Sequence, residues 1–413
     1  MKLLVSAYAC APNLGSDHAV GWNWATEAHR LGHEIWAFVS PAHRDSIATA
    51  CRQNPDLAGI HWIFPEVPRW PLLQGVEPKW ERTYNLLWQY KAIGHARELE
   101  RQVKFDAIHH LTWAGIRAPT FLGSVGTPLI IGPVGGGETS PRSLRDALGA
   151  RGRLLERIRD ISNATITVNP IVRRGFQDAA VIFVSTSDTQ KLFKGSLHDK
   201  TVVFSQLGLT EMPPVPQRQF NQPPKFLYAG RLLYWKGVHI AVRALAELTN
   251  KGIDARFTIV GDGPELLRLE HEAASWSLNN RIEFIPRVPQ AELFRLYETH
   301  DLLLFPSLHD SGGFVVLEAL SHGLPVVCLD LGGPKEIVTG DCGAIVRASS
   351  SGQNTEQLAV SVAAAISQLL ESPKKMAELS RGAIARAQEF ILSKRIATLY
   401  DRAADFIKEH ADG

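Results

Sequence analysis

The chain has 413 residues, of which 45% are hydrophobic and 21% charged, and its formal net charge is +2 at pH 7. This length is typical of two globular domains, and so small a net charge does not indicate a nucleic-acid partner. Four scattered cysteines without a C-x-x-C spacing suggest neither a zinc site nor a disulfide framework. A reducing cytoplasm is therefore the simplest setting.

The first half of the sequence alternates short apolar runs with predicted helices, which is the pattern of a parallel α/β sheet. The run at 3–7 predicts the first core strand, because it is too short to span a membrane and lacks a convincing signal-peptide cleavage region. Further strands are predicted at 33–39, 60–64, from 105 onwards, 128–132, 179–184 and 202–204, and helices at 19–31 and 80–103.

Three loops follow these strands, at the edge where open α/β sheets bind ligands. The loop at 10–18 contains Gly15, but it lacks the G-x-G-x-x-G spacing of dinucleotide-binding folds. His109 and His110 end a strand, where a neutral histidine can bind a substrate hydroxyl; a purely structural role is an equal alternative. Three consecutive glycines at 135–137 indicate close backbone approach or a positive φ.

Two other features of the first half allow two interpretations each. Trp62, Trp70, Trp80 and Trp88 suit stacking on sugars or contact with a lipid tail, but ordinary core packing explains them as well. The arginine-rich stretch at 142–159 suits an anionic membrane surface, or else forms a solvated helix face.

Proline-rich segments near 210–222 have the composition of a linker, and the α/β pattern resumes after them. Arg231 and Lys236 closely follow the first strand of this second half, so both can reach one crevice and neutralise a diphosphate there. The predicted strands are 225–229, 256–260, 282–285, 302–306, 326–329 and 343–346, and the main helices are 290–299, 355–371, 373–390 and 393–410.

The stretch 309–327 carries the most specific pattern of the chain. It predicts the end of a strand, a turn at Gly312 and Gly313, a short helix and another strand. The glycines let a ligand approach the backbone, and the helix offers free N–H groups to an anion. Asp310 and Glu318 flank this site, an arrangement that suits a ligand with central phosphates and a hydroxyl-rich sugar at each end, such as a nucleotide sugar.

These residues resemble a known family, the retaining GT-B-fold glycosyltransferases of group 1. That family has an acidic residue, seven further residues and then Glu, which Asp310 and Glu318 match, although the first acid is usually Glu. Its Gly-Arg-…-Lys-Gly and Val-Gly-Asp-Gly-Pro motifs are matched at 230–237 and 260–264.

The resemblance implies an α/β fold of two Rossmann-like, doubly wound parallel-sheet domains that face each other across a cleft (GT-B). The expected acceptor-binding domain is 1–211, followed by a linker at 212–224 and a donor-binding domain at 225–392. In such a fold the last helix, 393–413, packs back on the first domain.

The resemblance also implies roles for individual residues. The implied catalytic residues are Asp310, Arg231, Lys236 and His110, and the implied donor-binding residues are Glu318, Gly312, Gly313, Phe314, Val315, Arg287, Val288 and Gly15. Glu318 would bind the ribose, Asp310 the donor sugar, and the two cations the leaving diphosphate, so that no metal or other cofactor is expected. Adjacent His109-His110 depart from the family's Asp-x-x-His-x-His spacing, which makes the choice of His110 ambiguous.

The expected function is therefore transfer of a sugar from a nucleotide diphosphate sugar to an acceptor, with retention at the anomeric carbon, in cell-envelope or exopolysaccharide synthesis. The expected acceptor is a glycan, a polyprenyl-linked molecule or another small acceptor. The expected location is the cytoplasm, with peripheral association with the inner face of the membrane as an option. Two alternatives remain: a nucleotide-sugar epimerase or hydrolase on the same fold, and a non-catalytic nucleotide-sugar-binding subunit.

Overall fold

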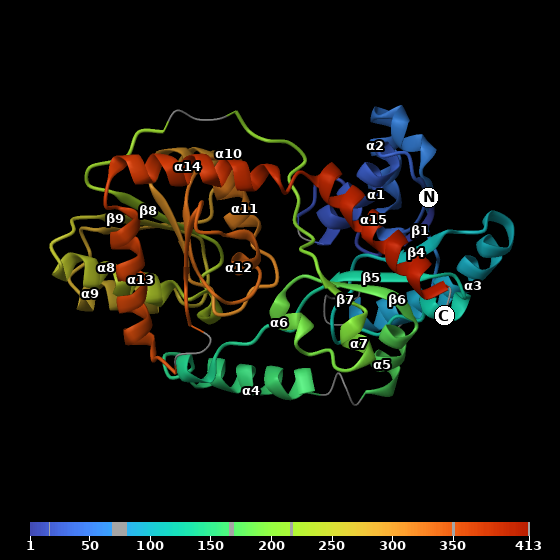
Figure 1. Cartoon of the computed structure of the whole chain (residues 1–413), viewed down its shortest axis with the longest axis horizontal. Helices are drawn as coiled ribbons and strands as arrows, with labels where there is room; N and C mark the ends of the chain where they lie inside the picture. Colours follow the sequence, from blue (N-terminus) through green and yellow to red (C-terminus); the bar gives the residue numbers. More distant parts are fainter. Residues whose placement is uncertain (16, 68–80, 165–168, 215–217, 349–351, 412–413) are drawn as a thin grey trace. The chain divides into compact units, whose positions relative to one another are not determined.

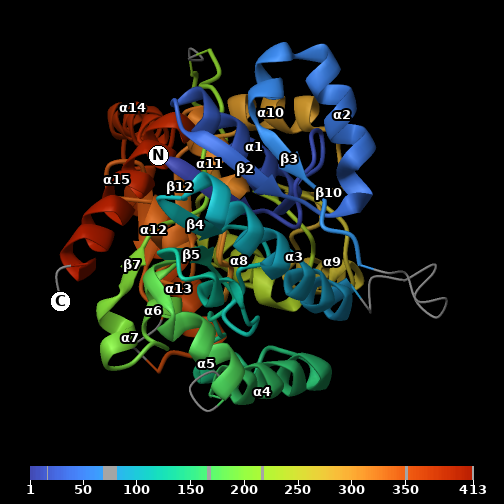
Figure 2. The same ribbon diagram turned by 90° about the vertical axis from the view of Figure 1, so that its right-hand side faces the viewer.

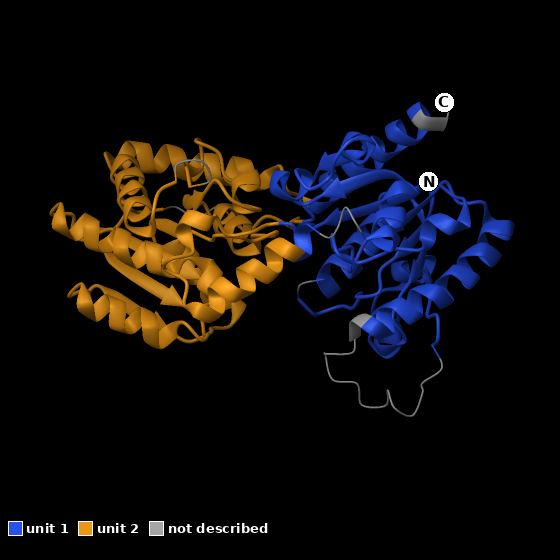
Figure 3. Ribbon diagram, turned by 90° about the horizontal axis from the view of Figure 1, so that it is seen from below, with its two compact units in different colours: residues 1–137, 162–206, 392–413 blue, residues 138–161, 207–391 orange. Residues whose placement is uncertain are grey.

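A computed structural model describes residues 1–15, 17–67, 81–164, 169–214, 218–348 and 352–411. Contacts within the chain divide it into two compact units (Figure 3). Unit 1 comprises Met1–Gly137, Ser162–Gln206 and Leu392–Gly413, and unit 2 comprises Glu138–Ile161 and Leu207–Ile391.

Unit 1 contains a sheet of parallel strands in the order β3-β2-β1-β4-β5-β6-β7 (Figure 1). Strands β1 and β4 lie at its centre, and Ser6 of β1 is in register with His110 of β4. The strands are β1 (Lys2–Ser6), β2 (Glu34–Phe38), β3 (His61–Ile63), β4 (Ala107–His110), β5 (Leu129–Val134), β6 (Ala179–Val184) and β7 (Thr201–Val203).

Helices cover both faces of this sheet, because alternate strand residues point to opposite sides. Leu3 and Val5 pack in one core with Trp24 of α1 and Ile396 of α15. Leu4 packs in the other core with residues of α3 and α5; Figure 2 shows α15 and α3 on opposite sides of the strands. The helices are α1 (Asp17–Arg30), α2 (Arg44–Gln53), α3 (Glu81–Val103), α5 (Pro170–Gln177), α6 (Ser187–Gln190), α7 (Ser196–Asp199) and α15 (Leu392–Ala411).

Unit 2 contains a second parallel sheet, in the order β10-β9-β8-β11-β12-β13. The strands are β8 (Lys225–Ala229), β9 (Arg256–Val260), β10 (Ile282–Ile285), β11 (Leu302–Phe305), β12 (Val326–Leu329) and β13 (Gly343–Val346). The helices are α8 (Val238–Asn250), α9 (Leu266–Ser275), α10 (Gln290–Thr299), α11 (Phe314–Ser321), α12 (Pro334–Ile337), α13 (Thr355–Leu369) and α14 (Pro373–Gln388). Strands β8, β11 and β12 are buried almost throughout, which explains their continuous apolar sequences.

The segment 138–161 differs from its predicted place, because it packs with unit 2 although the sequence assigns it to the domain 1–211. The reason is apolar burial: Leu144 and Leu148 are buried in the core of unit 2. Arg268 also donates a hydrogen bond to the carbonyl of Ala147, with a nitrogen–oxygen distance of 2.9 Å. Most of α4 (Ala150–Ala164) therefore belongs to unit 2, and only its last turn to unit 1.

The predicted linker, the clustered tryptophans and the question of a membrane-spanning helix can also be compared with the structure. The predicted linker at 212–224 falls within unit 2, where its residues 215–217 lie outside the described residues. Trp88 is fully buried in the core, and Trp62 stacks on Trp22 with ring centroids 5.5 Å apart. Trp70 and Trp80 also lie outside the described residues. No helix in the described part of the chain is long and apolar enough to cross a membrane.

Candidate functional site

The loops at the carboxyl ends of the unit 2 strands touch one another through their backbones. A Cβ on Gly237, which precedes α8 at a φ of +68°, would overlap the carbonyl oxygen of Pro306 after β11. A Cβ on Gly261, which follows β9, would overlap the carbonyl oxygen of Gly230 after β8. Only glycine allows such close approach. The glycines of the sequence motifs therefore bring these loops together at one edge of the sheet.

The loop between β11 and α11 is a tight turn held by Asp310. The Asp310 Oδ1 accepts a hydrogen bond from the backbone N–H of Gly312 at 3.3 Å, and its carbonyl accepts one from Gly333 at 2.6 Å. Gly313 has a φ of +132° and lies directly before α11. Phe314, the first helical residue, is exposed, and Val315 is half-buried. The turn thus directs the start of a helix, with its free N–H groups, toward this edge of the sheet.

Two cations lie at the same edge. The Lys236 ammonium forms an ion pair with the Asp310 carboxylate and lies over the ring of Phe305, 5.2 Å from its centroid. Arg231 is exposed, and its guanidinium has no hydrogen-bond or ion-pair partner among the residues that the structure describes. Its backbone carbonyl accepts a hydrogen bond from the Tyr228 hydroxyl at 3.1 Å. The site therefore offers one paired and one available positive charge to an anion.

Glu318 lies one turn inside α11 and is held by two side chains of α10. The Tyr297 hydroxyl donates to its Oε2 at 3.1 Å, and the Gln290 amide to its Oε1 at 3.3 Å. Burial raises the pKa of the Glu318 carboxyl above its ordinary value, although these two hydrogen bonds oppose that effect. A carboxylate in this position is well placed to accept hydrogen bonds from ligand hydroxyls.

The loop after β10 is tied to the loop after β9. The backbone N–H of Arg287 donates to Asp262 Oδ2 at 3.1 Å. The Arg287 side chain is exposed, and Val288 is half-buried. Both residues therefore belong to the same edge of unit 2 as Arg231, Lys236, Asp310 and Glu318.

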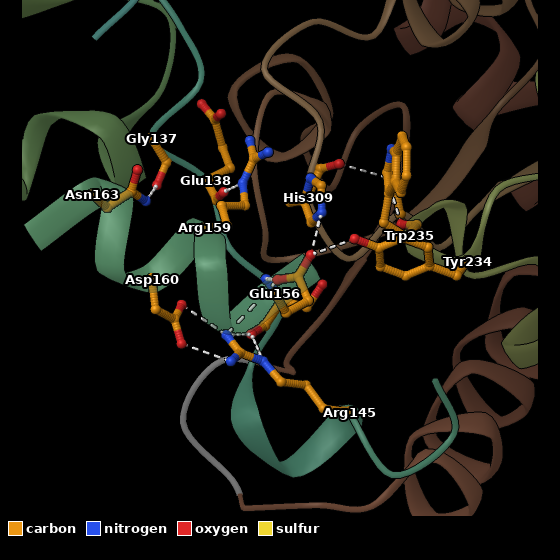
Figure 4. Close-up of polar contacts among 12 residues, drawn as sticks. Gly137, Glu138, Arg145, Glu156, Arg159, Asp160, Asn163, Tyr234, Trp235 and His309 are labelled. Carbon is orange, nitrogen blue, oxygen red and sulfur yellow. Dashed lines mark hydrogen bonds and ion pairs between the residues drawn. The ribbon is translucent and has the colours of Figure 1, made fainter. Parts of the chain in front are cut away.

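A buried carboxylate that sequence analysis missed lies directly beneath these loops (Figure 4). The Glu156 side chain of α4 is fully buried. Its Oε1 lies 2.8 Å from His309 Nε2 and accepts a hydrogen bond from the Tyr234 hydroxyl at 3.0 Å. His309 precedes Asp310 in sequence, and Tyr234 lies two residues before Lys236. One side chain of α4 thus contacts both loops of the candidate site.

Further contacts hold Glu156 ionised. Its Oε2 accepts a hydrogen bond from the backbone N–H of Ser140 at 2.9 Å and lies 3.8 Å from Arg145. Burial opposes ionisation, but the hydrogen bonds and the charge of His309 outweigh it, so the pKa of Glu156 is lowered to about 2. Burial and the neighbouring Glu156 carboxylate raise the pKa of Tyr234.

A further contact from the same segment reaches the turn itself, and a ring contact joins the two loops. Ser311 donates a hydrogen bond to Glu138 Oε2 at 2.8 Å. The His309 ring stacks on Trp235, with centroids 5.4 Å apart and planes 13° from parallel. The glycine turn and the loop after β8 are therefore both fastened to residues from the first half of the sequence.

The remaining predicted residues, His110 and Gly15, belong to unit 1. His109 is fixed in place, because its Nδ1 lies 3.0 Å from the Tyr400 hydroxyl and its Nε2 lies 2.7 Å from the Gly132 carbonyl. His110 is equally buried, but neither of its ring nitrogens has a hydrogen-bond partner within the described ranges. Burial, with His109 nearby, lowers the pKa of His110 to about 4.

Gly15 is exposed, and a Cβ there would meet open space. Its geometry therefore gives no reason for a glycine. Among the described residues, no group of three or more His, Cys, Asp or Glu side chains is arranged to hold a metal ion.

Comparison with known proteins finds a family model that matches part of the second unit. Residues 215–386 match the family model described as "Glycosyl transferases group 1". The matched region is less than half of the chain, and it contains the loops with Arg231, Lys236, Asp310 and Glu318. The resemblance to group 1 glycosyltransferases that was noted from the sequence is confirmed.

Among curated relatives, the glycogen synthase of Mycobacterium tuberculosis strain H37Rv is 31% identical to this chain over 154 residues. The aligned region covers 37% of this chain and only 37% of that protein. The chain thus matches little more than a third of this relative's length.

Solved structures match over the whole chain. Sucrose-phosphate synthase from Thermosynechococcus elongatus aligns over 100% of both chains with a TM-score of 0.61 and 16% identity. A second match is Anabaena HepE in complex with UDP, which covers 98% of this chain and 100% of that one, with a TM-score of 0.58 and 17% identity. At such low identity the likeness concerns the fold alone. The predicted fold class, two Rossmann-like α/β domains of the GT-B type, is confirmed.

Proposed function

We propose that the protein is a retaining glycosyltransferase that moves a sugar from a nucleotide diphosphate sugar to an acceptor. The observation that carries the proposal is the grouping of Arg231, Lys236, Asp310 and Glu318 on the contacting loops of a group 1 domain. These loops combine positive charge, a glycine turn before a helix and two carboxylates, as a ligand with central phosphates and hydroxyls at both ends requires.

Arg231 and Lys236 would stabilise the transition state. Negative charge grows on the diphosphate as the sugar–phosphate bond breaks, so cations already in place favour that state over the ground state. Lys236 forms an ion pair with Asp310. A bound diphosphate would therefore replace Asp310 as the partner of Lys236. With two protein cations at the leaving group, the reaction requires no metal ion.

The other contacts follow from the positions of the remaining loops. Glu318, with Tyr297 beside it, would accept hydrogen bonds from the ribose hydroxyls. Asp310 and the backbone at 312–315 would hold the donor sugar, and the backbone at 287–288 the nucleobase. Because Anabaena HepE is solved in complex with UDP, UDP is the first nucleotide to test.

Unit 1 would supply the acceptor site. Within the part of the chain that the structure describes, neither ring nitrogen of His110 has a hydrogen-bond partner, and His110 lies at the carboxyl end of β4, where open sheets bind ligands. The loop with Gly15 follows the neighbouring strand β1. Burial keeps the His110 imidazole neutral near pH 7, so it can accept or donate a hydrogen bond to a sugar hydroxyl. The acceptor class that we propose is a glycan or a polyprenyl-linked sugar of the cell envelope.

A thermal-shift panel with UDP, GDP and ADP, followed by their common sugars, tests the donor assignment. A nucleotide present at 100 times its Kd should add about 2.7 kcal/mol to the free energy of unfolding. We expect one base to stabilise the wild type, with or without EDTA, and Arg231→Ala to lose that stabilisation. Arg256→Ala is the matched control, because Arg256 begins β9 at the opposite end of the sheet.

Turnover is then measured as nucleotide release, with and without candidate acceptors. Release that needs an acceptor supports transfer, whereas equal release without one indicates a hydrolase. Donor binding without any release would favour a non-catalytic subunit. If no nucleotide stabilises the wild type, the donor-site assignment is wrong.

A further inference from the structure

The outward side of α4 is unusually apolar. Four large aliphatic residues on this helix are exposed: Leu154 by 57%, Leu155 by 41%, Ile158 by 50% and Ile161 by 65%. Leu154, Ile158 and Ile161 follow the i, i+4, i+7 spacing that places side chains on one face of a helix. An exposed stripe of this kind on a soluble protein marks an interaction surface.

The opposite side of α4 is fixed against unit 2, so the orientation of the stripe is determined. Glu156 is buried against His309 and Tyr234 (Figure 4). At 100° per residue, Glu156 points about 160° away from Ile158. The helix therefore cannot turn its aliphatic side inward without withdrawing Glu156 from its partners.

The charges around the stripe have one sign. Arg151, Arg153 and Arg157 are exposed on α4. The two carboxylates of the helix lie elsewhere: Glu156 is buried, and Asp160 forms an ion pair with Arg145. The surface thus combines aliphatic side chains with exposed arginines and lacks exposed acids along the helix.

We propose that α4 binds an anionic membrane surface. Leu154, Ile158 and Ile161 would enter the boundary between head groups and acyl chains, and the arginines would contact lipid phosphates. This surface explains why a basic stretch that could be fully solvated carries exposed aliphatic residues. Membrane binding goes beyond the proposed transfer reaction and does not depend on it.

Charge complementarity selects lipid over a second copy of the chain. In a symmetric dimer through this stripe, the same patch of both copies would meet, since a two-fold interface is self-complementary. Arg151 and Arg157 would then face the arginines of the other copy across an apolar contact. An anionic bilayer instead offers negative charge next to hydrocarbon, which matches both components of the surface.

Co-sedimentation of the full chain with vesicles tests the proposal. We expect binding to phosphatidylcholine vesicles that contain phosphatidylglycerol, little binding to pure phosphatidylcholine, and weakening as salt is raised. The double variant Leu154→Ser/Ile158→Ser should bind anionic vesicles at least about tenfold more weakly. Arg151→Gln/Arg157→Gln should also weaken binding and should reduce its salt dependence.

The matched control is Leu267→Ser, because Leu267 is equally an exposed leucine of unit 2, on α9; it should bind vesicles as the wild type does. Thermal unfolding and nucleotide-induced stabilisation should be unchanged in the α4 variants, which separates loss of lipid binding from misfolding and from failure of the donor site. Absence of wild-type binding to anionic vesicles, or equal binding by the α4 variants, would overturn the proposal. A lipid-free dimer that the variants abolish would assign the stripe to a second copy.

Discussion

Replacement of Glu156 by glutamine tests whether a buried charge from the first half of the sequence holds the two loops that carry Lys236 and Asp310. Glutamine keeps the shape of the side chain but removes the negative charge, and its NH₂ group cannot accept a hydrogen bond. The carboxylate accepts from Ser140, Tyr234 and His309. In the variant at least one of these groups loses its acceptor, which is costly for a buried polar group.

The expected loss of folding free energy in the variant follows from the pKa of Glu156. Burial alone would favour the neutral acid, yet the hydrogen bonds lower this pKa from 4.5 to about 2. A shift of that size corresponds to about 3 kcal/mol of stability from the ionised group. Because the folded-state pKa is below the unfolded one, this stability is fully present above about pH 4.5 and is lost as the pH falls through 2.

The assay is thermal unfolding of the wild type and of Glu156→Gln at pH 7 and near pH 3. At pH 7 we expect the variant to unfold roughly 6–12 °C lower. Near pH 3 the difference should fall to roughly half, because below pH 4.5 the unfolded chain takes up a proton at this carboxyl while the folded chain still holds it ionised. The nucleotide-induced stabilisation should also weaken, since His309 and Tyr234 adjoin the loops with Asp310 and Lys236.

Glu378→Gln is the matched control, because Glu378 is exposed on α14 of the same unit; it should unfold as the wild type does. An unchanged unfolding temperature of Glu156→Gln at pH 7 would refute the reasoning. A difference that stays constant down to pH 3 would show that shape, and not charge, sets the effect.

Three further comparisons test other parts of the structure. Gly237→Ala should lower the free energy of unfolding by about 3 kcal/mol, because a Cβ there overlaps a backbone carbonyl, whereas Gly340→Ala meets open space and should leave the urea midpoint unchanged. Glu318→Gln should lose nucleotide-induced stabilisation yet unfold no earlier than the wild type at pH 7. Because burial raises the pKa of Glu318, the ionised carboxylate destabilises the fold once the pH rises above the ordinary pKa of a glutamate. Thermal scans with and without nucleotide test both effects. His109→Leu should cost about 2 kcal/mol, because it removes two buried hydrogen bonds, whereas His110→Leu removes none and should leave the urea midpoint unchanged or raised.

Most of the strands are predictable from the sequence, and the physical reason is burial on both faces. Strands β6, β8, β9 and β12 have the bounds that their apolar runs predict. Helix α2 is not predictable in this way, since Ile47 is its one buried residue and leaves no apolar period to read. Local pattern therefore identifies an element only where the element has a wide buried face.

The position of segment 138–161 depends on contacts that no local pattern contains. Leu144 and Leu148 are apolar in either unit, and the sequence does not show which core receives them. Glu156 likewise resembles an ordinary counter-charge of a basic solvated helix until His309, more than 150 residues later, is seen beside it. The sequence feature that could have indicated burial of Glu156 is its position on the side of the helix opposite Leu154 and Ile158.

Asp310 is the point at which this chain departs from the usual Glu of the family that it resembles, and the loop geometry offers a reason. One oxygen accepts a hydrogen bond from the N–H of Gly312, two residues later, which is a contact that the short Asp side chain makes in turns. The other oxygen pairs with Lys236. Both oxygens are thus engaged by groups of the protein itself. In the proposed reaction the donor diphosphate takes over Lys236 and releases one oxygen of Asp310 for the sugar, so a single ion pair couples recognition of the phosphates to recognition of the sugar.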